Sequence, residues 1–286
     1  MTPAGDASPP RAPQNRLERL VRVYEHEIYP LFDRWFTAPL LARLRVRPVG
    51  PVDTVLDLGA ASGHLAEALG AQGPRTLVCG DPSGAMLALL RARVPVGRSA
   101  ALVRGGTADG LPFRTASFDR VFARGRADEA LAPLALLPEL VRVCRPGGEL
   151  AFTVAMQGTW AEPLDLLDEA LERRGFTEAR NALFAYRAQA VTAEDLEAAL
   201  TAAGVAAADV TIEEKQVLFR SGREFFFSAL VELGPLRRWK ALTGRGETLQ
   251  SAFAAMKTAI DTYYRGRTFS VTLRVATVLG QRPRAS

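Results

Sequence analysis

The sequence is poor in the residue types on which several protein classes depend. Its 286 residues include two cysteines, Cys79 and Cys144, which are too few for a disulfide framework and favour a reducing, cytoplasmic location. Two histidines and no cysteine–histidine cluster argue against a metal site. No run of about 18 apolar residues occurs, and the N-terminus lacks an apolar signal core. We therefore expect neither a membrane helix nor a secretory leader.

Lysine is also scarce, although the chain is basic. Only three of the 36 basic residues are lysine, and the formal net charge is +5. The charge is segregated, because residues 155–234 carry a net charge of −7 and residues 235–286 a net charge of +8. A basic surface can attract nucleic acid. The acidic and basic segments can also balance one another within one C-terminal unit. This second interpretation weakens the case for nucleic-acid binding.

The chain divides by its patterns into four parts. Residues 1–14 contain four prolines and predict a disordered tail. Apolar residues at helical spacing predict an N-terminal helical lid in residues 15–50. In residues 51–156, short apolar runs alternate with helical patterns, which predicts an α/β fold with a doubly wound, mostly parallel sheet. The expected strands are residues 54–58, 76–79, 101–103, 118–122 and 149–154.

The rest of the chain is more helical and completes the sheet. In residues 157–286, we expect strands at 210–219 and 270–279, separated by a helical insertion at 221–266 that forms an acceptor lid. Within it, residues 225–227 (three phenylalanines) and Trp239 either line an apolar pocket or pack in a core, and packing is favoured. Upstream, Pro138 is expected in the first turn of a helix that ends near Val143.

A turn of small residues follows the first expected strand. Small side chains let a ligand approach the backbone, and the helix that follows offers free N–H groups at its start. The dinucleotide fingerprint requires three glycines, but its positions hold Gly59, Ala61 and His64. No Gly-Lys-Ser/Thr follows, so a phosphate-binding loop is also excluded.

This turn instead resembles the first motif, Asp/Glu-x-Gly-x-Gly-x-Gly, of class I S-adenosylmethionine-dependent methyltransferases. Asp57, Gly59 and Gly63 match it, and Ala61 replaces the middle glycine. Three blocks follow in the family's order, at residues 80–87 (similar to Asp-x-Ser-x-x-Met-Leu), 107–121 (Leu-Pro-Phe…Phe-Asp-x-Val) and 139–148 (Glu-x-x-Arg-Val…Pro-Gly-Gly). Over residues 52–154, the chain resembles the ubiquinone/menaquinone-biosynthesis and malonyl-carrier-protein methyltransferase group.

The resemblance implies a Rossmann-like fold and S-adenosylmethionine as the cofactor. Asp81 would accept hydrogen bonds from the ribose hydroxyls, and the alternative is that it caps a helix. Ala108 and Asp109 would border the adenine, although Thr107 stands where the family has an acid. The implied cofactor-binding residues are Asp57, Gly59, Ala60, Ala61, Gly63, Asp81, Pro82, Met86, Ala108, Asp109 and Arg124. Arg124 can alternatively hold an acidic substrate or remain solvated.

The expected activity is O- or C-methylation of a small acidic or apolar acceptor by in-line displacement. His26 is the candidate base if the acceptor must lose a proton. His64 is expected to line the pocket, and Tyr29 can close over the methionine end or simply pack. Two alternatives stay open. One is a binding or scaffold protein that has lost catalysis, and the other is an RNA methyltransferase, suggested by the basic C-terminal segment but lacking the nucleic-acid signature motifs.

Overall fold

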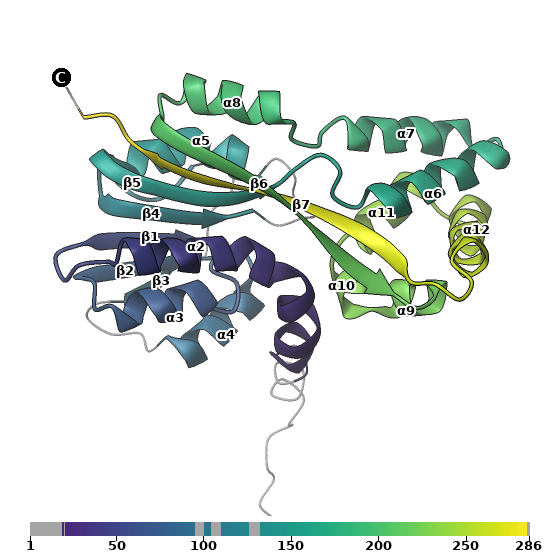
Figure 1. The fold of residues 1–286 in the computed structure, drawn as a ribbon, viewed down its shortest axis with the longest axis horizontal. Coiled ribbons are helices and arrows are strands. Elements are labelled where there is room, and N and C mark those ends of the chain that lie inside the picture. Colours follow the sequence, from purple (N-terminus) through teal and green to yellow (C-terminus); the bar gives the residue numbers. More distant parts are fainter. Residues whose placement is uncertain (1–18, 20, 95–99, 104–109, 126–131, 285–286) are drawn as a thin grey trace, which may run out of the picture.

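Seven strands within the described residues form one sheet, in the order β3-β2-β1-β4-β5-β7-β6 (Figure 1). The structure is a computed structural model that describes residues 19, 21–94, 100–103, 110–125 and 132–284. The strands are β1 (Thr54–Leu58), β2 (Thr76–Gly80), β3 (Ala100–Val103), β4 (Phe118–Arg124), β5 (Cys144–Ala155), β6 (Ala206–Phe219) and β7 (Phe269–Gln281). Strands β1 to β5 are parallel, and β6 and β7 are antiparallel to their neighbours. The predicted α/β class with a mostly parallel sheet is confirmed.

Helices cover both faces of the sheet. They are α2 (Arg34–Val46), α3 (His64–Ala71) and α4 (Gly84–Arg93) on one face and α5 (Ala132–Val143) and α8 (Ala193–Ala202) on the other. Successive side chains of a strand point to opposite faces. Val55 therefore packs against the first group of helices, and Leu56 packs against the second. Asp57 shares the face of Val55.

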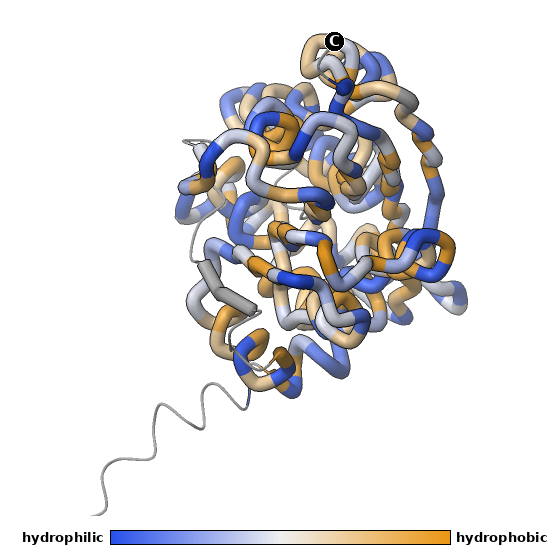
Figure 2. The backbone as a smooth tube through the Cα atoms, turned by 90° about the vertical axis from the view of Figure 1, so that its left-hand side faces the viewer, coloured by the Kyte–Doolittle hydropathy of each residue, from blue (hydrophilic) through white to orange (hydrophobic). Residues whose placement is uncertain are grey.

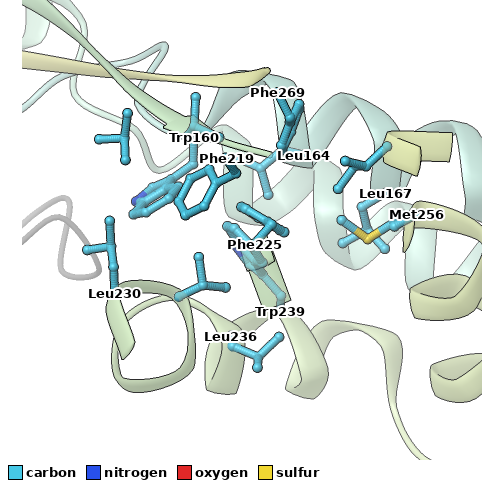
Figure 3. Packing of buried hydrophobic residues seen from close by; sticks show 14 of the residues in the cluster. Trp160, Leu164, Leu167, Phe219, Phe225, Leu230, Leu236, Trp239, Met256 and Phe269 are labelled. Atoms are coloured by element: carbon cyan, nitrogen blue, oxygen red, sulfur yellow. The ribbon is translucent and has the colours of Figure 1, made fainter. Parts of the chain in front are cut away.

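A helical lobe surrounds the far ends of β6 and β7, which extend well beyond the other strands (Figure 1). Its helices are α6 (Ala161–Arg173), α7 (Thr177–Arg187), α9 (Gly222–Phe227), α10 (Ala229–Leu233), α11 (Leu236–Thr243) and α12 (Glu247–Tyr263). Phe225, Trp239 and Met256 are fully buried in its core (Figure 3). Of the four aromatic residues predicted to line a pocket or pack, Phe225 and Trp239 therefore pack, whereas Phe227 is 75% exposed.

In the described part of the N-terminal segment, two consecutive helical elements follow the helical residues 21–23. The first, η1 (Tyr24–Asp33), has the wider π-helical spacing, and α2 follows directly. Pro30 lies inside η1, where it has no N–H to donate to a regular helical bond. Phe32 and Phe36 point into the core of the helical lobe. The N-terminal helices therefore join the sheet to the lobe. Residues 1–14, where we predict a disordered tail, lie outside the described residues.

One local expectation is wrong. Pro138 lies in the middle of α5, not in its first turn, because the helix begins at Ala132. A proline inside a helix removes one backbone hydrogen bond. The buried stripe of Leu136, Leu137 and Leu140 packs on both sides of it and holds the helix on the sheet.

Hydrophobic and hydrophilic residues alternate in short stretches along the described backbone (Figure 2). Among the described residues, no helix combines the length and the apolar character needed to cross a bilayer.

Candidate functional site

Three strands end together at the site. The last paired residues of β1, β2 and β4 are in register. These paired residues are Leu58, Gly80 and Ala123. The next residue along each strand is Gly59, Asp81 or Arg124, so these three residues lie side by side at this edge of the sheet. Ligands of open α/β sheets bind outside the carboxyl ends of the strands. This edge is therefore the first place to look for a ligand.

The turn after β1 depends on glycine geometry. Gly59 has φ +70°, and a Cβ there would lie 2.7 Å from the carbonyl oxygen of Arg124. Ala61 also adopts a left-handed conformation, with φ +46°. This explains why the related motif has glycine at that position, since an L-residue is strained there. Ala61 adopts this conformation despite its side chain.

Asp81 braces the turn through its carboxylate. Its Oδ2 accepts a hydrogen bond from the Ala61 N–H at 3.0 Å, and its Oδ1 accepts one from the Ser83 N–H at 2.8 Å. The cap of α4 is Ser83, whose Oγ accepts from the Met86 N–H. Each carboxylate oxygen of Asp81 keeps a further lone pair. Asp81 therefore does not act as the simple helix cap that we considered as an alternative, and it retains capacity for a ligand.

Asp57 and Arg124 form a buried, incompletely bonded pair. The Asp57 side chain is fully buried, and its Oδ2 lies 4.0 Å from Arg124 Nη2. Arg124 Nη1 donates to Thr37 Oγ1 at 2.8 Å. Neither oxygen of Asp57, nor Nε and Nη2 of Arg124, has a hydrogen-bond partner among the described residues. Burial raises the pKa of Asp57 to about 6, against the lowering effect of the Arg124 charge.

A cavity of about 270 Å³ opens over this edge. Five predicted cofactor residues contribute to its wall, namely Gly59, Ala61, Asp81, Met86 and Arg124. The opposite wall comes from η1, α2, the start of α6 and α10 with the residues after it. Its residues are Tyr24, Ile28, Phe32, Asp33, Phe36, Trp160, Leu230, Leu233, Gly234 and Pro235. The cavity thus has a polar side at the strand ends and a largely apolar side opposite.

The remaining predicted residues lie around the cavity or outside the description. Ala60 and Gly63 are buried within the turn, and Pro82 is exposed. Ala108 and Asp109 fall outside the described residues. His26, the candidate base, is exposed on η1 and does not line the cavity. Within the described ranges, no group of three or more histidine, cysteine, aspartate or glutamate side chains is arranged to hold a metal ion.

His64 fastens the N-terminal helix to the turn instead of lining the cavity. Its Nε2 lies 2.9 Å from Glu25 Oε2, and its ring stacks on Tyr29 with centroids 3.5 Å apart. Arg93 also pairs with Glu25 at 2.9 Å. Burial lowers the pKa of His64, although the charge of Glu25 opposes this. The expectation that His64 lines the pocket is wrong for the cavity as described.

Sequence patterns missed the apolar wall. Trp160 follows β5 at the same edge of the sheet as the turn. That position was the only feature of the sequence that could have indicated a place for Trp160 in the site. Leu230 and Pro235 belong to the insertion that we predict to be an acceptor lid. Within that insertion, however, the sequence pointed to the aromatic residues 225–227 and Trp239 as possible pocket residues, not to Leu230 and Pro235. These residues meet only in three dimensions, since about 70 residues separate Trp160 from Leu230.

Residues 56–152 match the family described as "Methyltransferase domain". The malonyl-[acyl-carrier protein] O-methyltransferase of Marinomonas sp. is 32% identical over 148 residues, which cover 51% of this chain and 53% of that protein. An uncharacterized methyltransferase of Mycobacterium tuberculosis is 41% identical over 96 residues, covering 34% of this chain and 37% of that protein. The match thus spans about half of the first relative and less of the second.

A solved structure supports the fold over a longer range. A putative methyltransferase from Bacillus halodurans has a TM-score of 0.53 and 20% identity, and the alignment covers 85% of this chain and 98% of that chain. At this identity, the likeness concerns the fold.

The steric constraint at Gly59 can be tested by comparison with a second glycine that has the same φ angle. Gly59 and Gly73 both have φ +70°, but a Cβ at Gly73 meets nothing within 4 Å. Gly73→Ala should therefore cost only the strain of the left-handed conformation, about 1 kcal/mol in the free energy of unfolding. Gly59→Ala adds a clash with the backbone of β4 and should cost about 3 kcal/mol or more. Urea unfolding measures both, and equal losses would contradict the close approach of β1 and β4.

The buried Asp57 predicts a pH dependence of stability. A carboxyl whose pKa is raised from 3.8 to about 6 on folding binds its proton more tightly in the folded state. Its contribution to stability is therefore greatest below about pH 4 and is lost as the pH rises to about 6. Asp57→Asn removes this loss, so the variant should gain about 1–3 kcal/mol relative to wild type between pH 4 and pH 7.

Urea unfolding at each pH measures the difference between the two proteins. Glu197→Gln, which neutralises an exposed carboxylate on α8, is the control, and its stability should change with pH as that of wild type does. A difference between Asp57→Asn and wild type that stays constant from pH 4 to pH 7 would refute the buried, proton-binding carboxyl.

Proposed function

We propose that this protein binds S-adenosylmethionine and transfers its methyl group to a small organic acceptor, because residues 56–152 match the Methyltransferase domain family. The single observation that carries the proposal is the cavity over the aligned ends of β1, β2 and β4. It has a polar side suited to the cofactor and a separate apolar side for an acceptor.

The residues at the polar side fit S-adenosylmethionine. Buried polar groups without partners cost free energy, about 1–3 kcal/mol each. Asp57 and Arg124 hold four such atoms. The methionine end of the cofactor carries a carboxylate group, and Arg124, which lines the cavity, would hold it. Asp57 does not line the cavity, and from 4.0 Å away its carboxylate would hold Arg124 in place. Asp81 would take the ribose hydroxyls, and Met86 lines the same wall.

The bound cofactor supplies a methyl group activated by a positive sulfonium centre. The chain's part is to orient, to exclude water and to manage protons. Phe32, Phe36 and Trp160 are each at most 5% exposed and form a wall that keeps water from the acceptor side. An in-line displacement needs little else when the acceptor is already a good nucleophile.

A hydroxyl acceptor must in addition lose a proton, and Asp33 is the group that can take it. Its carboxylate lines the cavity on the side opposite the turn and accepts a hydrogen bond from Tyr24. Asp33 thereby replaces the exposed His26 as the candidate base. The Marinomonas relative supports methylation of an oxygen on a small organic group, since it is named for O-methylation of a malonyl group that a carrier protein bears.

Isothermal titration with S-adenosylhomocysteine tests the cofactor site. We expect binding to wild type and a loss of roughly 10–100-fold in affinity for Arg124→Met, because a charge-assisted hydrogen bond is removed. Arg114→Met, at an exposed position before β4, is the matched control and should bind as wild type does. No binding by folded wild-type protein at millimolar ligand would refute the proposed cofactor.

The same protein can be assayed for turnover. Binding without methylation over a broad panel of acceptors would favour the alternative of a binding or scaffold protein. Methylation of any acceptor at a useful rate would dismiss it.

A further inference from the structure

Most of the apolar residues that line the cavity come from three segments of the chain. We define the acceptor chamber as the part of the cavity lined by Ile28, Phe32, Phe36, Trp160, Leu230, Leu233 and Pro235. Its walls come from the N-terminal helices, the start of α6 and the insertion between β6 and β7. Three segments that are far apart in sequence thus enclose one volume beside the cofactor residues.

Trp160 is the unusual residue of this chamber. It is not a glycine, yet it adopts a left-handed conformation with φ +63°. Its backbone is fully engaged, because its N–H donates to the Thr272 carbonyl at 2.9 Å and its carbonyl accepts from Leu164 at 3.2 Å. Strained backbone of this kind costs free energy and tends to occur where a side chain must be aimed. The surroundings therefore hold Trp160 in one orientation.

The indole ring of Trp160 carries an unused hydrogen-bond donor. The side chain is 2% exposed, and Nε1 has no partner among the described residues. Phe32 lies nearly parallel to the ring, with centroids 5.8 Å apart. Figure 3 shows the nitrogen at the end of the ring that faces away from Phe219, above Leu230. Since Leu230 lines the cavity, this donor is directed at the chamber.

The charges around the cavity disfavour an anionic acceptor. Among the described lining residues, Arg124 is the only cation, whereas Asp33 and Asp81 are both acidic. Arg124 lies beside Asp57, on the cofactor side. If it holds the methionine carboxylate, no cation remains among the described lining residues to neutralise a negative acceptor. Burying an unpaired charge is costly.

We propose that the acceptor is an uncharged, largely apolar molecule whose oxygen accepts a hydrogen bond from Trp160 Nε1 within the acceptor chamber. Phe32 and Leu230 contact its apolar body, and the indole N–H fixes its orientation relative to the strand ends. This inference rests on the proposed methyltransferase function and narrows it to one substrate class. Trp160 is then a residue that determines specificity and positions the acceptor.

Equilibrium dialysis with two matched probes tests the substrate class. In the presence of saturating S-adenosylhomocysteine, wild type should bind the neutral probe 2-naphthol at least about 10-fold more tightly than the anion 2-naphthoate. Equal or tighter binding of 2-naphthoate would overturn the uncharged acceptor.

Substitution of the indole tests the hydrogen bond. Trp160→Phe keeps an aromatic ring but removes the N–H, and should weaken 2-naphthol binding roughly 3–10-fold. Trp239→Phe is the matched control, because that indole is also buried and without a partner among the described residues but does not line the cavity. It should bind 2-naphthol as wild type does. An unchanged affinity in Trp160→Phe would overturn the assignment of Trp160.

Titration of each variant with S-adenosylhomocysteine separates the two levels of failure. Unchanged cofactor binding in Trp160→Phe shows that the protein is folded and that the change concerns the acceptor. If wild type binds no S-adenosylhomocysteine, the proposed function itself fails. If wild type binds S-adenosylhomocysteine but does not bind 2-naphthol, only the inference about the acceptor fails.

Discussion

The approach of the turn after β1 to the end of β4 is the constraint on which the site depends. Only a residue without a side chain fits at Gly59, because the Arg124 carbonyl occupies the space of a Cβ. This contact brings the Arg124 side chain beside Asp57 and leaves both with unused hydrogen-bonding atoms. The local fold thus tolerates an unfavourable buried pair of which one member, Arg124, borders the cavity.

The second feature is that two hydrophobic cores meet at one cavity. The sheet core supplies the aligned strand ends, and the lobe core supplies the apolar wall through Trp160 and Leu230. The N-terminal helix connects the two, since Phe32 packs in the lobe while Glu25 and Tyr29 contact His64 at the turn. A change in the position of this helix would alter the proposed cofactor and acceptor sides together.

Much of the fold could be predicted from the sequence because its signals are local. An apolar run followed by small residues specifies β1 and its turn, and β7 carries a long, largely apolar pattern. The chamber could not be predicted in the same way, because Trp160 and Leu230 meet only through tertiary packing. Pro138 shows the opposite case, in which packing overrides a local preference. Within the basic C-terminal segment, Arg282 donates to backbone carbonyls at the end of α5 and beyond, so part of the charge serves the fold.

A crystal structure with S-adenosylhomocysteine tests the central claim most directly. The account predicts that the amino-acid end of the ligand lies against Gly59, with its carboxylate bonded to Arg124, and that the sulfur faces Trp160 and Leu230. A ligand bound elsewhere on the sheet, or one whose carboxylate makes no contact with Arg124, would contradict it.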